Sequence, residues 1–158
     1  MRSKNIFEND DAVSISIGFI LMFAITVLMF TSVILSFYSL SQNSEKTAMR
    51  ESFRVVGSGV AAKITTVDML VNITKSYDGN INLLEYEFSI PDSMASKSYF
   101  VNITNSPQEI IIESENGAKT VSPYNLTTNI TQRLLYSGGE NYMIKYNASG
   151  DNIEIIDR

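Results

Sequence analysis

The first hydrophobic feature of the chain is a long stretch without a charged residue, which begins directly after Asp10 and Asp11. No residue from 12 to 44 carries a charge, and the densest apolar part covers residues 17–37. At about 1.5 Å per residue this part forms a helix roughly 31 Å long, which matches a hydrocarbon core of about 30 Å. A secretory signal has an apolar region of only about 7 to 15 residues and ends at a small-residue cleavage site. The pattern therefore predicts a membrane helix that is retained.

Hydroxyl side chains interrupt the apolar run without breaking it. They are Thr26, Thr31, Ser32 and Ser36. We expect their hydroxyls to bond back to backbone carbonyls one turn earlier in the helix. Ser32 and Ser36 also form a small-xxx-small pair, a pattern that allows two helices to approach closely.

A second hydrophobic pattern follows, in which apolar residues recur at steps of three or four. They are Met49, Phe53, Val56, Val60, Ile64, Val67 and Val71. This spacing predicts an amphipathic helix over residues 41–76. The charged residues expected off its apolar face are Glu45, Arg50, Glu51, Arg54 and Asp68. No proline separates it from the membrane helix, so the two can form one rod, with any break near residues 41–44. Gly57 and Gly59 either kink the helix or allow a close contact. The apolar face either packs on a domain of the same chain or contacts neighbouring subunits.

Beyond residue 80 the period changes to two, because Leu84, Tyr86, Phe88 and Ile90 alternate with polar residues. This alternation predicts a half-buried strand. Further strands are expected at 99–104, 109–113, 118–121, 130–136, 142–146 and 153–156. Asn116-Gly117 is typical of a hairpin turn. The predicted fold class is α+β: a long N-terminal helix, membrane-spanning over 13–40 and amphipathic over 41–76, followed by a small antiparallel β-rich domain over 77–158.

Composition narrows the candidate chemistry. The chain has no Cys and no His, so it lacks a thiolate nucleophile and the commonest general base and metal ligand. Asp78-Gly79-Asn80-Ile81-Asn82 begins like a calcium loop, but Leu83 and Ser89 stand where Gly and Glu are needed. We therefore expect no enzyme, no cofactor and no metal site. The net charge of -5 argues against a nucleic-acid partner.

Two features bear on orientation. Arg2 and Lys4 precede the apolar run and Lys46, Arg50 and Arg54 follow it, so the charge bias across the predicted membrane helix is nearly balanced. Glycosylation sequons occur at Asn72, Asn102, Asn125, Asn129 and Asn147. If they are used, the C-terminal part lies outside the cell. The alternative interpretation is ordinary strand and turn chemistry in a chain rich in Asn and Thr.

The start of the apolar run resembles a known family. Asp10-Asp11-Ala12-Val13-Ser14, followed by the run from Ile17 to Val27, resembles the N-terminus of archaeal type IV pilins and pilin-like proteins. The resemblance implies a leader over residues 1–12, with Asp11 and Ala12 as its last two positions. A membrane peptidase would cut before Val13 and leave the helix in place. The common Ser-Pro pair is replaced by Ser14-Ile15 in this chain.

A weaker resemblance extends into the amphipathic segment. Arg54-Val55-Val56-Gly57, Val60-Ala61-Ala62-Lys63-Ile64 and Val67-Asp68 are similar to the second segment of a group of uncharacterised archaeal pilin-like membrane proteins. Those proteins end in a small β-rich domain. This second match implies an architecture and no specific activity.

The resemblance implies a structural function: a pilin-like subunit or cell-envelope protein anchored or assembled through its apolar helix. The expected partners are the membrane, further copies or other pilin-like subunits, the leader peptidase and the pilus assembly machinery. The expected location is the cell membrane, with a single span and an extracellular C-terminal domain, or a surface filament. The alternative hypothesis is a single-pass surface glycoprotein that binds a partner and does not polymerise.

Overall fold

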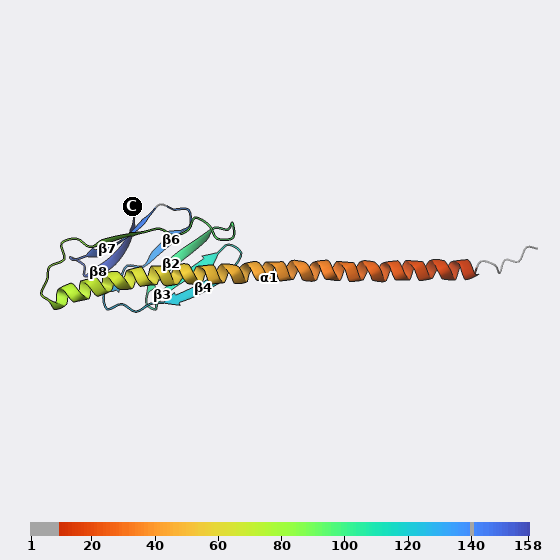
Figure 1. The fold of residues 1–158 in the computed structure, drawn as a ribbon, viewed down its shortest axis with the longest axis horizontal. Coiled ribbons are helices and arrows are strands. Elements are labelled where there is room, and N and C mark those ends of the chain that lie inside the picture. Colours follow the sequence, from red (N-terminus) through yellow and green to blue (C-terminus); the bar gives the residue numbers. More distant parts are fainter. Residues whose placement is uncertain (1–9, 140) are drawn as a thin grey trace, which may run out of the picture. The chain divides into compact units, whose positions relative to one another are not determined.

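The chain has an α+β fold, with one long helix followed by a small β region in which most strands run antiparallel (Figure 1). The computed structural model describes residues 10–139 and 141–158, with side chains described from Ser14 onward. Most of the predicted leader, residues 1–9, therefore lies outside the described residues. The chain divides into two compact units, Met1–Asn43 and Ser44–Arg158, and each is described by itself.

The helix α1 spans Asp10–Ser76 without interruption. The break that the sequence allowed near residues 41–44 is absent from this helix, because no proline interrupts the backbone hydrogen bonds. The helix ends in a turn in which the Gly79 N–H donates to the Thr74 carbonyl over 2.9 Å. Asp78, the start of the rejected calcium loop, adopts a φ of 54° in this turn.

Among the described residues of the second unit, eight strands form two four-stranded sheets. The first sheet has the order β1-β7-β8-β5 and the second has the order β4-β3-β2-β6. The strands are β1 (Glu85–Phe88), β2 (Tyr99–Asn105), β3 (Gln108–Ser114), β4 (Lys119–Pro123), β5 (Asn129–Ile130), β6 (Arg133–Tyr136), β7 (Tyr142–Asn147) and β8 (Asn152–Asp157).

One predicted strand is wrong in an informative way. Residues 130–136 were expected to form a single strand, but Ile130 belongs to β5 in the first sheet and 133–136 form β6 in the second. β5 pairs in parallel with β8, where the Thr131 N–H donates to the Ile153 carbonyl over 2.8 Å. The chain therefore changes sheets at residues 131–132, and local alternation of apolar and polar residues contains no signal for such a change.

The predicted hairpin at Asn116-Gly117 is confirmed and joins β3 to β4. Gly117 has a φ of +78°, which glycine adopts without the steric cost that a side chain adds. The Asn116 side chain closes the turn by accepting hydrogen bonds from the Ser114 hydroxyl and the Ala118 N–H. Another hairpin joins β7 to β8, also as predicted.

The core of the second unit lies between the two sheets and the second half of α1. Almost the whole apolar stripe of the helix is buried there, with Phe53, Ile64 and Val67 at zero exposure and only Val56 half-buried. The Phe53 ring lies 5.3 Å from the ring of Tyr99 on β2. The yellow-green stretch of α1 in Figure 1 follows the strands for most of their length. The interpretation that this face packs on a domain of its own chain is therefore confirmed.

Gly57 provides the close contact that the sequence allowed. A Cβ atom at this position would lie 3.1 Å from the Ser122 Cβ on β4 and 3.5 Å from a methyl group of Ile112 on β3. The glycine thus lets the helix approach the second sheet more closely than any other residue would permit. Gly59 has no such neighbour within 4 Å.

Candidate functional site

The first half of α1 exposes nearly all of its apolar surface. Its large apolar side chains are between about half and three-quarters exposed, as in Phe19 at 72% and Val27 at 46%. Within the described residues, one helix is long and apolar enough to cross a membrane, and none of its apolar stretch is buried inside the protein. Monomeric soluble proteins rarely expose contiguous apolar patches larger than a few hundred Å². This surface is therefore the strongest candidate for a functional interface.

Three of the four hydroxyl groups that were expected to bond back to the helix backbone do so. Thr26 donates to the Met22 carbonyl, Thr31 to that of Val27 and Ser32 to that of Leu28, each over 2.8 Å. A hydroxyl bonded in this way adds little polar surface to the helix exterior. The apolar character of the stretch is therefore preserved despite its Ser and Thr residues.

The predicted cleavage site lies at the start of the described helix. Asp11, Ala12 and Val13 have helical backbone conformation within α1, but their side chains lie outside the described residues. The structure therefore places the backbone of these three residues and leaves leader cleavage a prediction.

Asp68 is a structural residue whose position in the fold differs from the one expected from the sequence. It was expected off the apolar face of the helix, but it is 95% buried, with a relative exposure of 5%. Its two carboxylate oxygens accept hydrogen bonds from the backbone N–H groups of Thr127 and Thr128, at 3.0 and 2.9 Å. A buried carboxylate is tolerated when such bonds replace its lost hydration. The signal in the sequence was one acid directly after Val67 in an otherwise apolar stripe.

The end of α1 is tied to the β7–β8 turn by an exposed ionic cluster. Lys75 forms an ion pair with Asp151, and the Tyr146 hydroxyl donates to the same carboxylate over 2.9 Å. The hydrogen bonds to Asp151 and Tyr146 raise the pKa of Lys75, and the hydrogen bonds from Lys75 and Tyr146 lower the pKa of Asp151. Both groups are thus held in their charged forms at neutral pH.

Two tyrosines, the buried Tyr99 and the half-buried Tyr124, are the other groups with shifted titration. The Tyr99 hydroxyl donates to the Pro91 carbonyl over 2.6 Å, and the Tyr124 hydroxyl donates to that of Thr104 over 2.5 Å. Burial raises the pKa of each to about 12. Both phenols are therefore neutral hydrogen-bond donors at physiological pH and are poorly suited to act as bases.

The sequon asparagines occupy separate places on the second unit. Asn72 lies half-buried on α1 and Asn102 half-buried on β2, whereas Asn125 and Asn129 are exposed on either side of the segment held by Asp68. Asn129 also accepts a long hydrogen bond of 3.5 Å from the Asn105 side chain. The structure does not gather the five into a single surface.

Asn147 has the most engaged side chain of the sequon asparagines. Its Oδ1 accepts hydrogen bonds from the N–H groups of Ser149 and Gly150, and its Nδ2 donates to Glu154 over 2.9 Å. Nδ2 is the atom to which a glycan would be attached, and it already contacts Glu154. In the folded domain Asn125, which is exposed, is therefore a more accessible acceptor than Asn147.

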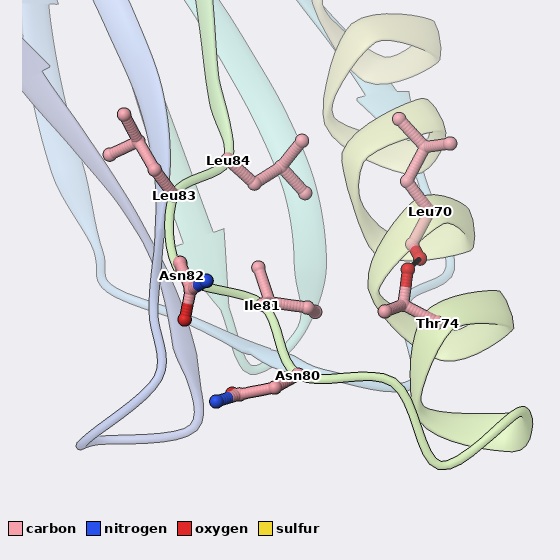
Figure 2. A pocket seen from close by; sticks show the side chains of 7 residues that line it. All are labelled: Leu70, Thr74, Asn80, Ile81, Asn82, Leu83 and Leu84. Atoms are coloured by element: carbon pink, nitrogen blue, oxygen red, sulfur yellow. Dashed lines mark hydrogen bonds between the residues drawn. The ribbon is translucent and has the colours of Figure 1, made fainter.

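A pocket of about 440 Å³ lies between the last turns of α1 and the segment that leads into β1 (Figure 2). Figure 2 shows Ile81 and Leu84 directed toward the helix, while Leu83 points the other way. The remaining lining residues are Leu70, Thr74, Asn80 and Asn82. The lining holds no charged group, so this pocket can offer apolar contacts and amide hydrogen bonds but no acid–base chemistry.

No group of three or more His, Cys, Asp or Glu side chains that could hold a metal ion occurs among residues 14–139 and 141–158. Taken together, fold and surfaces define a class: a small β domain joined to a helix that is long and apolar enough to cross a membrane. A comparison with models of protein families shows which family the chain belongs to. It belongs to the family described as "Family of unknown function (DUF7266)", whose model matches residues 8–156. No curated protein and no solved structure matches it.

Proposed function

We propose that this chain is a structural, pilin-like subunit of the cell envelope. In this proposal the leader is cut before Val13, and the first half of α1 anchors the protein in the membrane or packs into an assembly. The β domain is then displayed outside the cell. The observation that carries the proposal is the single unbroken helix in which one half exposes its apolar side chains and the other half is built into the domain core.

The physical basis is the cost of exposing this surface to water. At about 25 cal/mol per Å², one fully exposed large apolar side chain represents about 1.5–3 kcal/mol of unfavourable hydration. Lipid removes that cost while the helix lies in a bilayer, and equivalent helices would remove it in a filament. The membrane is therefore a stable location for the subunit, and extraction into a filament would require an assembly machinery.

The leader motif supports pilin-like processing in preference to a simple anchor. A signal anchor has no need of Asp11-Ala12-Val13 directly before its apolar stretch, whereas a leader peptidase of the pilin type would recognise these positions. The motif and the long helix are the two features that support this part of the proposal.

A second candidate function is a membrane-anchored surface glycoprotein that binds a partner and does not polymerise. The observation that favours it is the exposure of the sequon residues Asn125 and Asn129 on the β domain. Both candidates share the anchor and the external domain, and they differ in whether the apolar helix ever leaves the lipid.

Mass spectrometry of the mature N-terminus in native cell envelopes tests the proposal. A terminus at Val13 is expected, and an Asp11→Ala/Ala12→Leu variant should retain its leader while still inserting in the membrane. An intact Met1 would contradict processing and leave a signal anchor. A terminus near Gln42 would show that the apolar helix is discarded, and would overturn both candidates. Sheared surface filaments that contain the chain would then separate the first candidate from the second.

A further inference from the structure

Cations without an acidic partner in the chain gather near the start of the second unit. Among the described residues, five lysines and arginines form ion pairs: Lys75, Lys119, Arg133, Lys145 and Arg158. Lys63 instead lies 5.5 Å from the centre of the Phe88 ring. Within the same described residues, no acidic or aromatic partner is found for Lys46, Arg50, Arg54 and Lys97. Three of these four cations follow one another on the same helix.

The three helical cations, which we call the basic ladder, are Lys46, Arg50 and Arg54. Steps of four residues place their side chains one above another on the same side of α1. Arg50 and Arg54 are exposed, and Lys46 is half-buried. Like charges at this spacing repel one another, so the ladder is unfavourable unless an anion lies beside it.

A cleft of about 220 Å³ lies beside the ladder, wholly within the second unit. It is lined by Thr47, Arg50, Glu51, Arg54 and Thr120. The Thr120 hydroxyl on β4 donates to the Arg50 carbonyl over 3.2 Å, which holds this turn of the helix against the sheet. Glu51 is the one acid of the lining, and among the described residues it forms no ion pair with either arginine. Both guanidinium groups can therefore bind an anion from outside the chain.

The ladder begins shortly after the apolar run ends. Lys46 follows Leu40 by six residues, which is roughly 9 Å of helix, and Arg50 lies about 6 Å further along. The headgroup region adds about 5–8 Å to each side of the hydrocarbon core. Helical side chains tilt toward the N-terminus of their helix, and long basic side chains extend toward headgroups. The lower part of the ladder therefore reaches the level of the lipid phosphates when the first half of α1 spans a bilayer.

We propose that the basic ladder binds the phosphate groups of anionic membrane lipids. Guanidinium groups bind phosphate oxygens through two hydrogen bonds at once, and basic residues next to a membrane span are attracted to anionic headgroups. The remainder of the domain is repelled, because residues 55–158 hold seven Lys/Arg and twelve Asp/Glu, a balance of -5. The ladder is therefore the part of the second unit best suited to contact an anionic bilayer.

This inference rests on membrane insertion of the first half of α1, which is part of the proposed function. It depends neither on leader cleavage nor on the side of the membrane where the domain lies.

Lipid retention tests the inference. The full chain is reconstituted in vesicles with equal amounts of phosphatidylcholine and phosphatidylglycerol and is then extracted in a mild detergent. The lipids that stay bound are measured by mass spectrometry. The natural chain is expected to enrich phosphatidylglycerol several-fold, and raised salt should weaken that enrichment. The variant Lys46→Gln/Arg50→Gln/Arg54→Gln should lose it, whereas Glu51→Gln should increase it.

A control variant, Lys75→Gln/Arg133→Gln/Lys145→Gln, removes the same amount of charge from cations that already have acidic partners. It should retain phosphatidylglycerol as the natural chain does. The double variant Arg50→Gln/Arg54→Gln changes exposed positions only, so the domain should still fold while most of the enrichment is lost. Equal loss in the ladder and control variants, or no loss in the ladder variant, would overturn the proposal.

Free phosphate is the other source of the same chemistry. Inorganic phosphate added in excess to the chain in lipid-free detergent should leave its unfolding midpoint unchanged. Stabilisation by phosphate that the ladder variant lacks would overturn the assignment to lipid. Release of the chain from membranes by alkaline carbonate would overturn the anchor and this inference together. A chain that stays in the membrane without enriching phosphatidylglycerol would refute the inference alone.

Discussion

Residues 14–43 and residues 44–76 belong to one continuous helix, yet they differ in what covers their apolar side chains. In the first stretch the apolar residues surround the whole helix and all are exposed. In the second most of them form a stripe that is buried against the sheets, and a few, such as Val55 and Met69, are exposed on other sides of the helix. Backbone geometry is the same in both, so the arrangement of side chains alone decides whether a stretch needs lipid, its own domain or a partner.

The comparison also shows where stability comes from. The buried stripe and the two sheets form a single hydrophobic core, so the second half of the helix is held by tertiary packing. The first half contributes nothing to that core and is free to be covered by lipid or by another helix. A substitution should therefore have a large effect on folding only in the second half, and only on its buried face.

The largest expected effect on stability comes from comparing two positions of α1 that are two residues apart, Phe53 and Val55. Phe53→Ala should destabilise the second unit by about 3–5 kcal/mol, because it empties a fully buried site against Tyr99. Val55→Ala, at an exposed position, should change stability by less than about 0.5 kcal/mol. Urea unfolding of the full chain in dilute detergent measures both. Equal changes in the free energy of unfolding would contradict the finding that Phe53 is buried and Val55 is exposed.

The next effect concerns the buried carboxylate. Asp68→Ala should cost about 2–3 kcal/mol, because the N–H groups of Thr127 and Thr128 lose their acceptors. Asp68→Asn keeps one acceptor oxygen and should cost less. Glu51→Ala, an exposed acid on the same helix, serves as the control and should be nearly neutral. Hydrogen exchange at Thr128 should quicken in the Asp68 variants, and unchanged exchange would refute the assigned role.

The two glycines of the second half should respond in opposite directions. Gly57→Ala should destabilise by about 1 kcal/mol, because the new methyl group collides with Ser122 and displaces the helix. Gly59→Ala has open space and should stabilise by about 0.5–1 kcal/mol through helix propensity. Thermal unfolding of the two variants compares them directly. Stabilisation by both would show that the helix and β4 are farther apart than described.

The smallest effect is that of the exposed Lys75–Asp151 pair. The pKa of Asp151 is lowered in the fold, so its contribution is present above its ordinary pKa of 3.8 and is lost as the pH falls through the folded value. The pKa of Lys75 is raised, so its contribution is present below 10.5 and is lost as the pH rises through the folded value. Asp151→Asn should therefore lower the unfolding midpoint slightly at pH 7 and leave it unchanged in strong acid. A difference that persists in strong acid would contradict this assignment.

Sequence patterns were sufficient for the elements whose signal is local. The stripe from Met49 to Val71 predicted the buried helix face, and the period of two predicted β1. The β-branched and aromatic residues of 99–104 and 109–113 predicted β2 and β3 close to their observed bounds. Asn116-Gly117 identified a hairpin because tight hairpin turns need a positive φ, which glycine adopts readily. Gly117 has such a positive φ. In each case the information lies within a few residues of the element it determines.

Features that depend on distant residues could not be predicted in this way. The division of 130–136 between two sheets depends on the pairing of Ile130 with Ile153, which lies beyond any local window. Asp68 was expected off the buried face of the helix, because local sequence does not show which groups it bonds. The N–H groups that donate to its carboxylate belong to Thr127 and Thr128, which lie 59 and 60 residues away in the sequence.

The most direct test of the account is labelling of single-cysteine variants on intact cells with a membrane-impermeant maleimide. We predict that Ser149→Cys and Arg54→Cys label on intact cells, whereas cysteines at Phe23, Leu28 and Ile34 stay unlabelled until the membrane is dissolved. That result would place the first half of α1 in lipid and the domain outside. Labelling at Phe23, Leu28 and Ile34 on intact cells, or at Ser149 only after lysis, would contradict the central claim.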